Sequence, residues 1–290
     1  MLINEGGYGC IYQPGICNKD NTQISKVVNT YVAERELQMS RLIKKIPNYQ
    51  DYFVTVISSC KVKAKKIKYK CSALYKETNF VSLQMPFIKT VNIPFGLPQY
   101  IELIPYISKL IKAKIVHFDL KEDNVLFTPS PLIIDFGISL DMRKFSPDYF
   151  FLYDPTQYHW PIDVHLLCYM MSSPLHTGSL EKVCKEVYKQ SPFLKNVNEC
   201  ISHYSYLLTC SKQDGIKRLL HGWKTWDMYA LTVMLLLRED VPDLYLNLHP
   251  NHKNRLSPRS SRTAATSALG TISLTTSTSH HRGGITSNPV

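Results

Sequence analysis

The sequence has no long hydrophobic run. Its longest uncharged apolar stretch, Met228–Leu237, is shorter than the roughly 18 residues that suggest a membrane span, and it suits a buried helix. The first ten residues, MLINEGGYGC, have neither the basic segment nor the apolar core of a signal peptide. We therefore expect a soluble intracellular protein of the cytoplasm, with no membrane partner.

Cysteine pairs of the C-x-x-C type are also missing, and no Cys/His quartet has the spacing of a zinc finger. The eight cysteines are scattered between Cys10 and Cys210. Disulfides and metal ligation are the alternatives, but this scatter favours reduced and mostly buried thiols. No pattern in the sequence predicts an oligomeric state.

Acidic residues are missing from the last forty positions, which hold five of the basic residues. Much of the formal net charge of +11 is therefore local. Beyond Pro258 the chain is rich in Ser, Thr and Gly and poor in large apolar residues, which is typical of disorder. We expect residues 259–290 to form a disordered, basic, Ser/Thr-rich tail.

A second basic stretch, Lys61–Lys70, begins with lysines at alternate positions, KVKAK. Alternation with period two predicts a half-buried strand with a solvated lysine face. Nucleic-acid binding is the alternative, but the stretch lacks the arginines and the interleaved aromatic side chains that such sites favour. A nucleic acid is therefore not expected among the partners.

Strand patterns dominate the first third of the chain. Residues 3–85 contain several short apolar runs, interrupted by a helical pattern over Val32–Ile46. The stretch FVSLQM, Phe80–Met85, predicts a buried strand that ends at Pro86. We expect a small sheet with one helix packed on it.

Helical patterns dominate from Pro98 onward. Tyr100–Lys114 is apolar at helical spacing, although Pro105 must lie early in the helix or kink it. A strand pair is predicted at residues 125–127 and 132–134. Apolar residues then recur at helical spacing, at Leu180, Val183 and Val187 and again at Leu194, Val197, Ile201, Tyr204 and Leu208. The predicted fold class is α+β, with a small β-rich part and a larger, mainly helical part.

A glycine-rich stretch, NEGGYGCIY, lies near the N-terminus. A hairpin with Gly6, Gly7 and Gly9 at its tip, between Ile3 and Ile11, would bring backbone N–H groups close to phosphate oxygens. A hairpin without a ligand is the alternative, and the stretch taken alone favours it.

Lys26 follows in the apolar run QISKVV. By itself it favours a lysine that points outward at a sheet edge, but after a glycine-rich hairpin it can reach toward bound phosphates. Such a lysine needs an acidic partner, and the next helix offers Glu34 and Glu36. Glu36 is preferred because Met39 and Ile43 continue its helical face.

The stretch HFDLKEDNVLF combines acids, a lysine and an asparagine between two apolar segments. Asn124 lies in its predicted loop, and Asp135 ends the following apolar strand. The predicted hairpin would bring Asn124 and Asp135 to one end, where their oxygens could hold Mg²⁺ together with substrate phosphates. Asp119 is then free to accept or orient the proton of an attacking hydroxyl, and Lys121 can neutralise a transferring phosphoryl group.

Together these stretches resemble the eukaryotic-type protein kinases, because the glycine-rich loop, the strand lysine, HFDLKEDN and IIDFG occur in the order of that family. The resemblance covers roughly residues 1–258. It implies an N-terminal lobe at about 1–86, a C-terminal lobe at about 89–258 and a helical insertion at about 164–222.

The resemblance also implies an activity, the Mg²⁺-dependent transfer of the γ-phosphate of ATP to serine or threonine hydroxyls of a protein substrate. It assigns catalysis to Asp119, Lys121 and Asn124, and metal binding to Asn124 and Asp135. The nucleotide would be bound by Gly6, Gly7, Gly9, Ile11, Lys26, Glu36 and Met85.

Weaker matches imply structural roles. TWDMYAL resembles the family's buried helix whose aspartate, here Asp227, braces the catalytic loop. YHWPID resembles the end of the activation segment, with Asp163 in place of a glutamate. Arg255, in HPNHKNRLSP, would pair with Asp163.

Two departures from the family pattern affect activity and regulation. Asn4 stands where the first glycine is expected, although asparagine tolerates left-handed backbone. Phe118 replaces the arginine that couples a phosphorylated activation loop to the catalytic aspartate, which argues against that mode of activation. The divergent pattern is similar to kinases of large DNA viruses, which would place the protein in the host cytoplasm or the virion.

Two other functions stay open. A pseudokinase would use the fold as a nucleotide-binding scaffold, as Asn4 and Phe118 would allow. A small-molecule kinase would share an aspartate and an asparagine, but such enzymes usually lack the equivalents of Lys121 and of the DFG glycine. An active protein kinase is favoured because Lys26, Asp119, Asn124 and Asp135 are all present.

Overall fold

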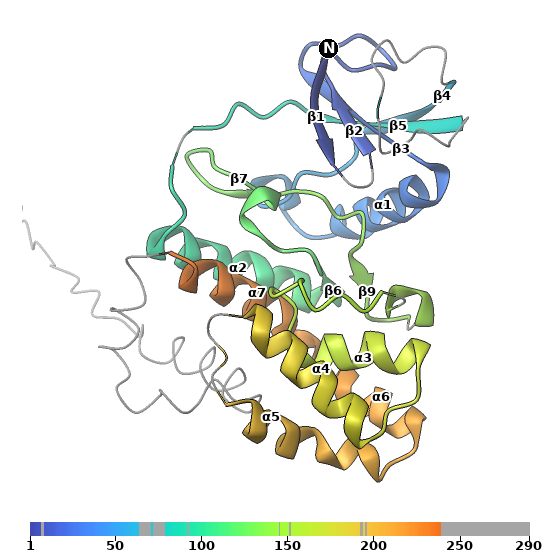
Figure 1. The fold of residues 1–290 in the computed structure, drawn as a ribbon. Coiled ribbons are helices and arrows are strands. Elements are labelled where there is room, and N and C mark those ends of the chain that lie inside the picture. The colour runs from blue at the N-terminus through green and yellow to red at the C-terminus, as the bar shows by residue number, and fades with distance from the viewer. Residues whose placement is uncertain are drawn as a thin grey trace, which may run out of the picture.

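The computed structural model describes residues 1–6, 9–63, 71, 79–91, 93–144, 146–150, 152–191, 194 and 196–238. Gly7, Arg255, the lysines from Lys65 to Lys70 and the predicted tail at 259–290 lie outside these residues. The described chain is a mixed α+β fold, with a β-sheet at one end and most of the helices at the other (Figure 1).

The sheet has five antiparallel strands in the order β1-β2-β3-β5-β4. The predicted buried strand at 80–85 is confirmed as β5. Pairing of β2 with β3 sets Ile11 opposite Lys26, and pairing of β3 with β5 sets Ile24 opposite Met85. The strands are β1 Leu2–Gly6, β2 Gly9–Tyr12, β3 Gln23–Val28, β4 Ser58–Lys63 and β5 Asn79–Pro86.

Helix α1, Thr30–Ile43, packs against β5. Its N-terminus is capped by Asn29, whose side chain accepts a hydrogen bond from the Val32 amide. The predicted inward face is confirmed, since Glu36, Met39 and Ile43 are all buried. The sheet and α1 therefore bring a glutamate to the inner side of β3.

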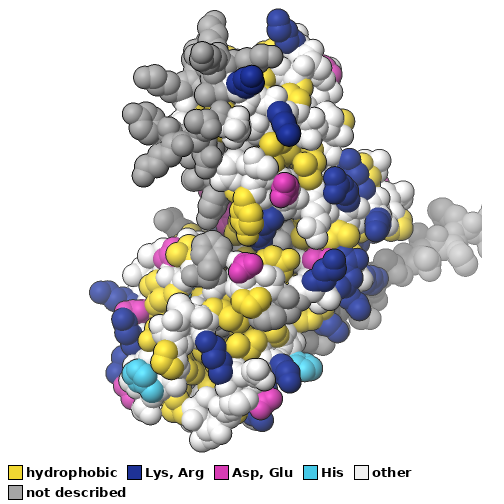
Figure 2. All heavy atoms as spheres, turned by 90° about the vertical axis from the view of Figure 1, so that its right-hand side faces the viewer, with side chains coloured by type: hydrophobic (Ala, Val, Ile, Leu, Met, Phe, Trp, Pro, Cys, Tyr) yellow, Lys and Arg dark blue, Asp and Glu magenta, His cyan; other side chains and the backbone are white. Residues whose placement is uncertain are grey.

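The edge strand β4 carries the described part of the second basic stretch. Lys61 and Lys63 are exposed while Val62 is buried, which confirms the solvated lysine face for these residues. On the face shown in Figure 2, Lys and Arg side chains lie among hydrophobic and acidic ones over both the sheet and the helical part. That mixture gives no support to a nucleic-acid surface there.

Helix α2, Leu97–Lys112, follows the sheet and starts earlier than the apolar pattern predicted. Of the two positions that the sequence left open for Pro105, early in the helix or at a kink within it, the early one is excluded, because Pro105 lies in the helix interior. The carbonyl that loses a partner to this proline belongs to Ile101, whose side chain is exposed. Water can replace the missing hydrogen bond on that face.

Two short ladders follow α2. Strand β6, Ile115–Val116, pairs with β9, Leu140–Asp141. Strand β7, Val125–Leu126, pairs with β8, Leu132–Ile133, which confirms the predicted hairpin. The loops between these ladders carry the polar residues of the HFDLKEDN and IIDFG stretches.

The rest of the described chain is helical. Leu180, Val183 and Val187 are buried on one face of α4, as predicted, and α7 is buried along most of its length. No helix among the described residues is both long enough and apolar enough to cross a membrane. The helices are α3 Ile162–Ser172, α4 Thr177–Gln190, α5 Val197–Tyr204, α6 Lys212–Leu220 and α7 Trp226–Leu236.

Four of the eight cysteines form disulfides, Cys10–Cys71 and Cys17–Cys60, so the prediction of reduced thiols is wrong for them. The Cα atoms of each pair are 6.0 Å apart although 61 and 43 positions separate the cysteines in the chain. Only the folded sheet brings them together. The remaining cysteines are free thiols, at Cys168, Cys184, Cys200 and Cys210.

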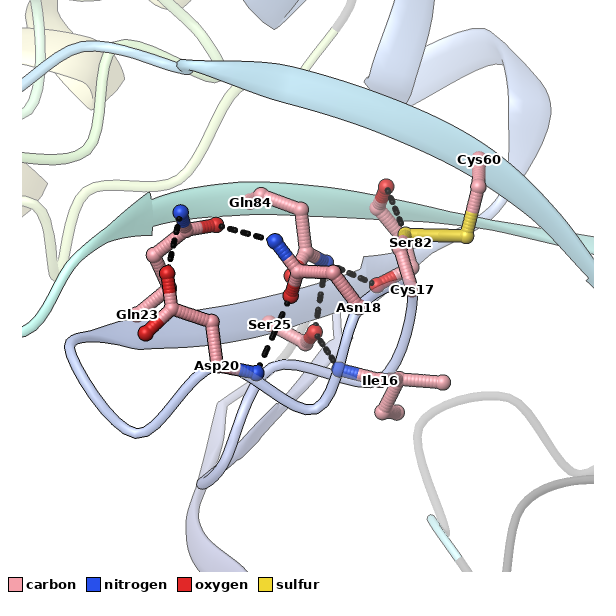
Figure 3. Close-up of a disulfide and its surroundings, with 9 residues drawn as sticks. All are labelled: Ile16, Cys17, Asn18, Asp20, Gln23, Ser25, Cys60, Ser82 and Gln84. Atoms are coloured by element: carbon pink, nitrogen blue, oxygen red, sulfur yellow. Dashed lines mark hydrogen bonds between the residues drawn. A yellow bond between two sulfur atoms is a disulfide. The ribbon is translucent and has the colours of Figure 1, made fainter.

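The Cys17–Cys60 disulfide fastens the loop between β2 and β3 to the edge strand (Figure 3). Beneath it, Gln84 Nε2 donates to Ser25 Oγ at 2.6 Å and to Ser82 Oγ at 2.8 Å. A Cβ at Gly15 would lie 2.4 Å from Gln84 Oε1, so a larger residue there would require the Gln84 side chain to shift. Ser25 Oγ also accepts a hydrogen bond of 2.6 Å from the amide of Ile16 in the loop, so the disulfide and a buried polar network hold the same loop.

Replacing both Cys17 and Cys60 by serine should lower the free energy of unfolding by about 2 to 5 kcal/mol, because the disulfide restricts the conformations of the unfolded chain. Denaturant unfolding measures the loss, and Cys210→Ser is the control, with a change within about 0.5 kcal/mol. Thiol titration of the denatured, unreduced protein should find the four free cysteines. Eight reactive thiols would contradict the pairing.

Candidate active site

Lys26 connects three parts of the chain. Its Nζ atom donates to Glu36 Oε2 at 3.0 Å and to Asp135 Oδ1 at 2.6 Å. The preference for Glu36 over Glu34 is confirmed. Because Lys26 lies on β3, Glu36 on α1 and Asp135 just after β8, this ion group joins the sheet, the helix and the IIDFG stretch.

Lys26 and Asp135 are charged at neutral pH. Burial acts against the charge of Lys26, but the two carboxylates raise its pKa well above the usual range. Burial raises the pKa of Glu36, and the attraction of Lys26 opposes this rise. Burial also acts to raise the pKa of Asp135, but the Lys26 charge outweighs it and lowers that pKa, so Asp135 is ionised.

Gly137 lies against the same ion group. A Cβ at this position would be 3.2 Å from Asp135 Oδ1 and 3.4 Å from Glu36 Oε2. The Gly137 amide also donates to Asp135 Oδ1 at 3.3 Å. The glycine of IIDFG therefore makes room for the carboxylates and supplies one more donor to them.

Asp119 is the centre of a second polar group. Lys121 Nζ lies 3.0 Å from both of its carboxylate oxygens. Asn124 Nδ2 donates to Asp119 Oδ2 at 2.9 Å and to the Asp119 carbonyl at 2.7 Å. His159 Nε2 lies 3.4 Å from Oδ1. The structure thus brings together the three residues predicted to be catalytic and adds a histidine.

The donors around Asp119 stabilise its ionised form. Burial acts to raise the pKa of this carboxyl, but the contact with His159 and the charge of Lys121 lower it to about 2. Asp119 therefore carries a full negative charge throughout the neutral range.

The β7–β8 hairpin brings the second group close to the first. The Ile134 amide donates to the Asn124 carbonyl at 3.0 Å, so Asn124 lies beside the residue that precedes Asp135. Asp135 has a left-handed backbone with φ of 62°, a conformation that is strained for a non-glycine residue. The buried ring of Phe136 packs against His117 and Phe53 and holds this turn in place.

Asp227 supports the loop before Asp119. Its Oδ2 accepts a hydrogen bond of 2.7 Å from the His117 amide, and its Oδ1 accepts one of 3.1 Å from the Phe118 amide. The predicted brace is confirmed. The carboxylate is needed there because both amides are buried and Phe118 has a left-handed backbone with φ of 70°.

The His117 ring adds a further support. Its Nε2 lies 2.8 Å from the Ile134 carbonyl, and the Asp119 amide donates to its Nδ1 at 3.3 Å. These partners select the tautomer that carries its proton on Nε2. His117 therefore links the two polar stretches of the sequence.

Phe118 is buried among aromatic side chains. Its ring stacks on Trp160 with a centroid distance of 4.8 Å, and Trp160 Nε1 donates to the Phe118 carbonyl at 2.7 Å. Phe150 and Trp226 pack edge-on or tilted against the same ring. The position where the family has an arginine is thus the centre of an apolar contact.

The described nucleotide-binding residues predicted in the sheet lie on β1, β2, β3 and β5. Gly9 is held tightly, since a Cβ there would lie 2.3 Å from the Val27 carbonyl oxygen, whereas Gly6 has room around it. Ile11 is paired with Lys26, and Met85 is buried near the end of β5. Asn4 is paired with Ile11 in β1 and does not have the left-handed backbone allowed for it.

Two site residues were not predicted, His159 and Trp160. Both lie in YHWPID, some forty positions beyond Phe118 and Asp119, and no local pattern marks their contacts. The partner predicted for Asp163, Arg255, lies outside the described residues, and Asp163 accepts a hydrogen bond from Tyr204 Oη at 3.1 Å.

No protein-family model matches the chain, and a comparison with curated proteins finds no match either. The function is therefore inferred from the residues and their geometry.

Replacing Asp227 by alanine should lower the free energy of unfolding by about 2 to 5 kcal/mol, because two buried amides lose their acceptor. Denaturant unfolding measures this loss. The exposed Asp123 provides the control, and Asp123→Ala should change stability by no more than about 0.5 kcal/mol. Equal stability of the two variants would contradict the brace.

The pKa of Asp119 predicts a pH dependence of stability. The folded pKa of about 2 is below the ordinary 3.8, so the ionised carboxylate stabilises the fold above about pH 4. That contribution is lost as the pH falls through the folded pKa. The stability difference between the wild type and Asp119→Asn should therefore shrink by about 2 kcal/mol between about pH 6 and pH 2. Denaturant unfolding across this range tests it, and parallel curves would contradict it.

Proposed function

We propose that the chain is an active serine/threonine protein kinase of the eukaryotic type, which uses Mg²⁺ and transfers the γ-phosphate of ATP to a protein hydroxyl. The single observation that carries the proposal is the pair of adjacent polar groups, Lys26 with Glu36 and Asp135, and Asp119 with Lys121 and Asn124. These residues come from separate stretches whose order in the chain resembles that family.

In the proposed reaction Lys26 binds the phosphates of ATP. Its charge is secured by Glu36, which is buried and comes from α1, so the ammonium group is positioned as well as ionised. Gly6, Gly7, Gly9 and Ile11 would form the cover over the nucleotide, and Met85 would contribute at the end of β5. Each of these contacts is part of the proposal.

The donor set fits Mg²⁺, which prefers a few oxygen ligands together with water and phosphate. Among the described residues, both hydrogen bonds to the Asp135 carboxylate go to Oδ1, so Oδ2 is the atom available to a cation. Asn124 uses Nδ2 toward Asp119, which leaves its amide oxygen. A bound Mg²⁺ would neutralise charge on the phosphate oxygens.

Asp119 would orient the hydroxyl of the protein substrate and accept its proton. A carboxylate with a pKa of about 2 is a weak base. This suits a phosphoryl transfer in which the attacking hydroxyl loses its proton late, so that orientation contributes more than early proton removal. Lys121 would stabilise the transferring phosphoryl group.

The arrangement of elements is compatible with the two lobes that the proposal requires. The five-stranded sheet and α1 would form the first lobe at about 1–86, and α2 and the following helices would belong to the second, at about 89–258. Helices α4 to α6 lie within the range of the proposed insertion at about 164–222, and α3 begins two residues before it.

A location in the host cytoplasm or the virion, and a relation to kinases of large DNA viruses, belong to the same proposal. Disulfides are rare in a reducing cytoplasm, so Cys10–Cys71 and Cys17–Cys60 favour a more oxidising setting for the folded protein. The thiol titration described above therefore bears on location as well.

The proposal is tested by transfer of labelled γ-phosphate from Mg-ATP to a generic basic protein. Wild type should transfer label, and Asp119→Asn and Asp135→Asn should each reduce the rate by about 10²- to 10⁴-fold, because one removes the acceptor for the hydroxyl and the other a ligand of the metal. Asp123→Asn is the matched control, since this exposed aspartate lies in the same loop. It should retain the wild-type rate.

Other outcomes separate the alternatives. If the wild type binds ATP but transfers no more label than Asp119→Asn, the pseudokinase interpretation replaces the proposal. If label passes to small alcohols and not to protein, the chain is a small-molecule kinase. A panel of both acceptor types in the same assay distinguishes these cases.

A further inference from the structure

His159 is a buried histidine without a strong partner. The residue is 6% exposed, and its Nε2 atom makes no full hydrogen bond in the structure. The contact it does make is the 3.4 Å approach to Asp119 Oδ1. A buried ring nitrogen that lacks a good partner needs an explanation, and here the nitrogen is aimed at the central carboxylate of the site.

The neighbouring residue fixes the position of this imidazole. Trp160 Nε1 donates to the Phe118 carbonyl at 2.7 Å, and the Trp160 ring stacks on Phe118. Phe118 directly precedes Asp119 in the chain. The segment that carries His159 is therefore attached to the segment that carries Asp119. This attachment holds the two side chains facing each other.

The other two donors to Asp119 have further roles in the proposed reaction. Lys121 is assigned to the transferring phosphoryl group, so it must share its contact with Asp119 or give it up. Asn124 is assigned to the metal through its amide oxygen and can keep Nδ2 on Asp119 Oδ2. His159 has no other assignment, so it can stay on Oδ1 while substrates are bound.

We infer that His159 is a positioning residue for the reaction, and that its Nε2–H holds Asp119 Oδ1 so that Oδ2 faces the substrate hydroxyl. This inference rests on the proposed function. It assigns a specific atom to each role, since Asn124 contacts Oδ2 and His159 contacts Oδ1. When Lys121 turns to the phosphoryl group, Oδ2 becomes available to the hydroxyl, while His159 and Asn124 keep the orientation of the carboxylate.

Three variants test the inference in the phosphoryl-transfer assay. His159→Leu removes the donor but keeps a side chain of similar bulk, and it should lower kcat by about 10²-fold while KM for ATP stays within about threefold. His159→Gln offers an amide N–H of similar reach and should keep kcat within about fivefold of wild type. His165→Leu is the control for loss of a buried imidazole, because His165 also packs beside Trp160. It should retain wild-type kcat.

Thermal unfolding of each variant separates positioning from folding. The inference holds if His159→Leu is folded, binds ATP normally and is rescued by glutamine at the same position. It is overturned if folded His159→Leu has wild-type kcat, or if both His159 variants lose stability and activity together. Absence of transfer by the folded wild type would instead overturn the proposed function, and this inference with it.

Discussion

The pairing of the buried Lys26 ammonium group with two carboxylates is the interaction on which the rest of the site depends. A charge that is so little exposed is unfavourable unless it is paired, and here two carboxylates pair it. Because Glu36 lies on α1 and Asp135 on the segment after β8, neither element can shift without leaving a buried charge uncompensated. The ion pairs of Lys26 therefore fix the positions of helix α1 and of the loop after β8. The small size of Gly137 is part of the same constraint, since any side chain there would press on both carboxylates.

The loop that carries Asp119 is held in a different way, by aromatic packing and by hydrogen bonds from backbone amides to Asp227. Phe118 stacks on Trp160 and also contacts Phe150 and Trp226, and Asp227 accepts from the backbone amides beneath it. An aromatic stack does not respond to the charge of a phosphate, whereas an arginine does. In the proposed function this contact therefore keeps the loop and the YHWPID segment together whether or not the chain is phosphorylated. In the sequence, Phe118 argues against activation by a phosphorylated loop. In the structure, it is the centre of an aromatic contact that does not depend on phosphorylation.

Local patterns predicted the parts of the fold that local forces determine. The inward face of Glu36, Met39 and Ile43, the strand at 80–85 and the hairpin that joins Asn124 to Ile134 all follow from spacing over a few residues. The predictions that failed involve contacts between residues that are far apart in the sequence. Spacing along the chain cannot reveal such contacts. The cysteine pairs depend on the order of strands in the sheet, and the contact of His159 with Asp119 depends on how the segment before α3 folds back. The sequence left two positions open for Pro105 because the apolar pattern does not show where the helix begins.

The pKa of Asp119 connects these constraints to chemistry. Three donors hold its carboxylate in the structure, and together they make it too weak a base to take a proton early. In the proposed reaction two of the donors, Lys121 and Asn124, are also needed by the phosphates and the metal. Binding of ATP would draw the Lys121 ammonium group toward the phosphates, and the loss of that neighbouring positive charge would raise the pKa of the Asp119 carboxyl. The basicity of Asp119 would then increase only when the nucleotide is in place, so the same residues that bind one substrate would prepare the group that receives the other.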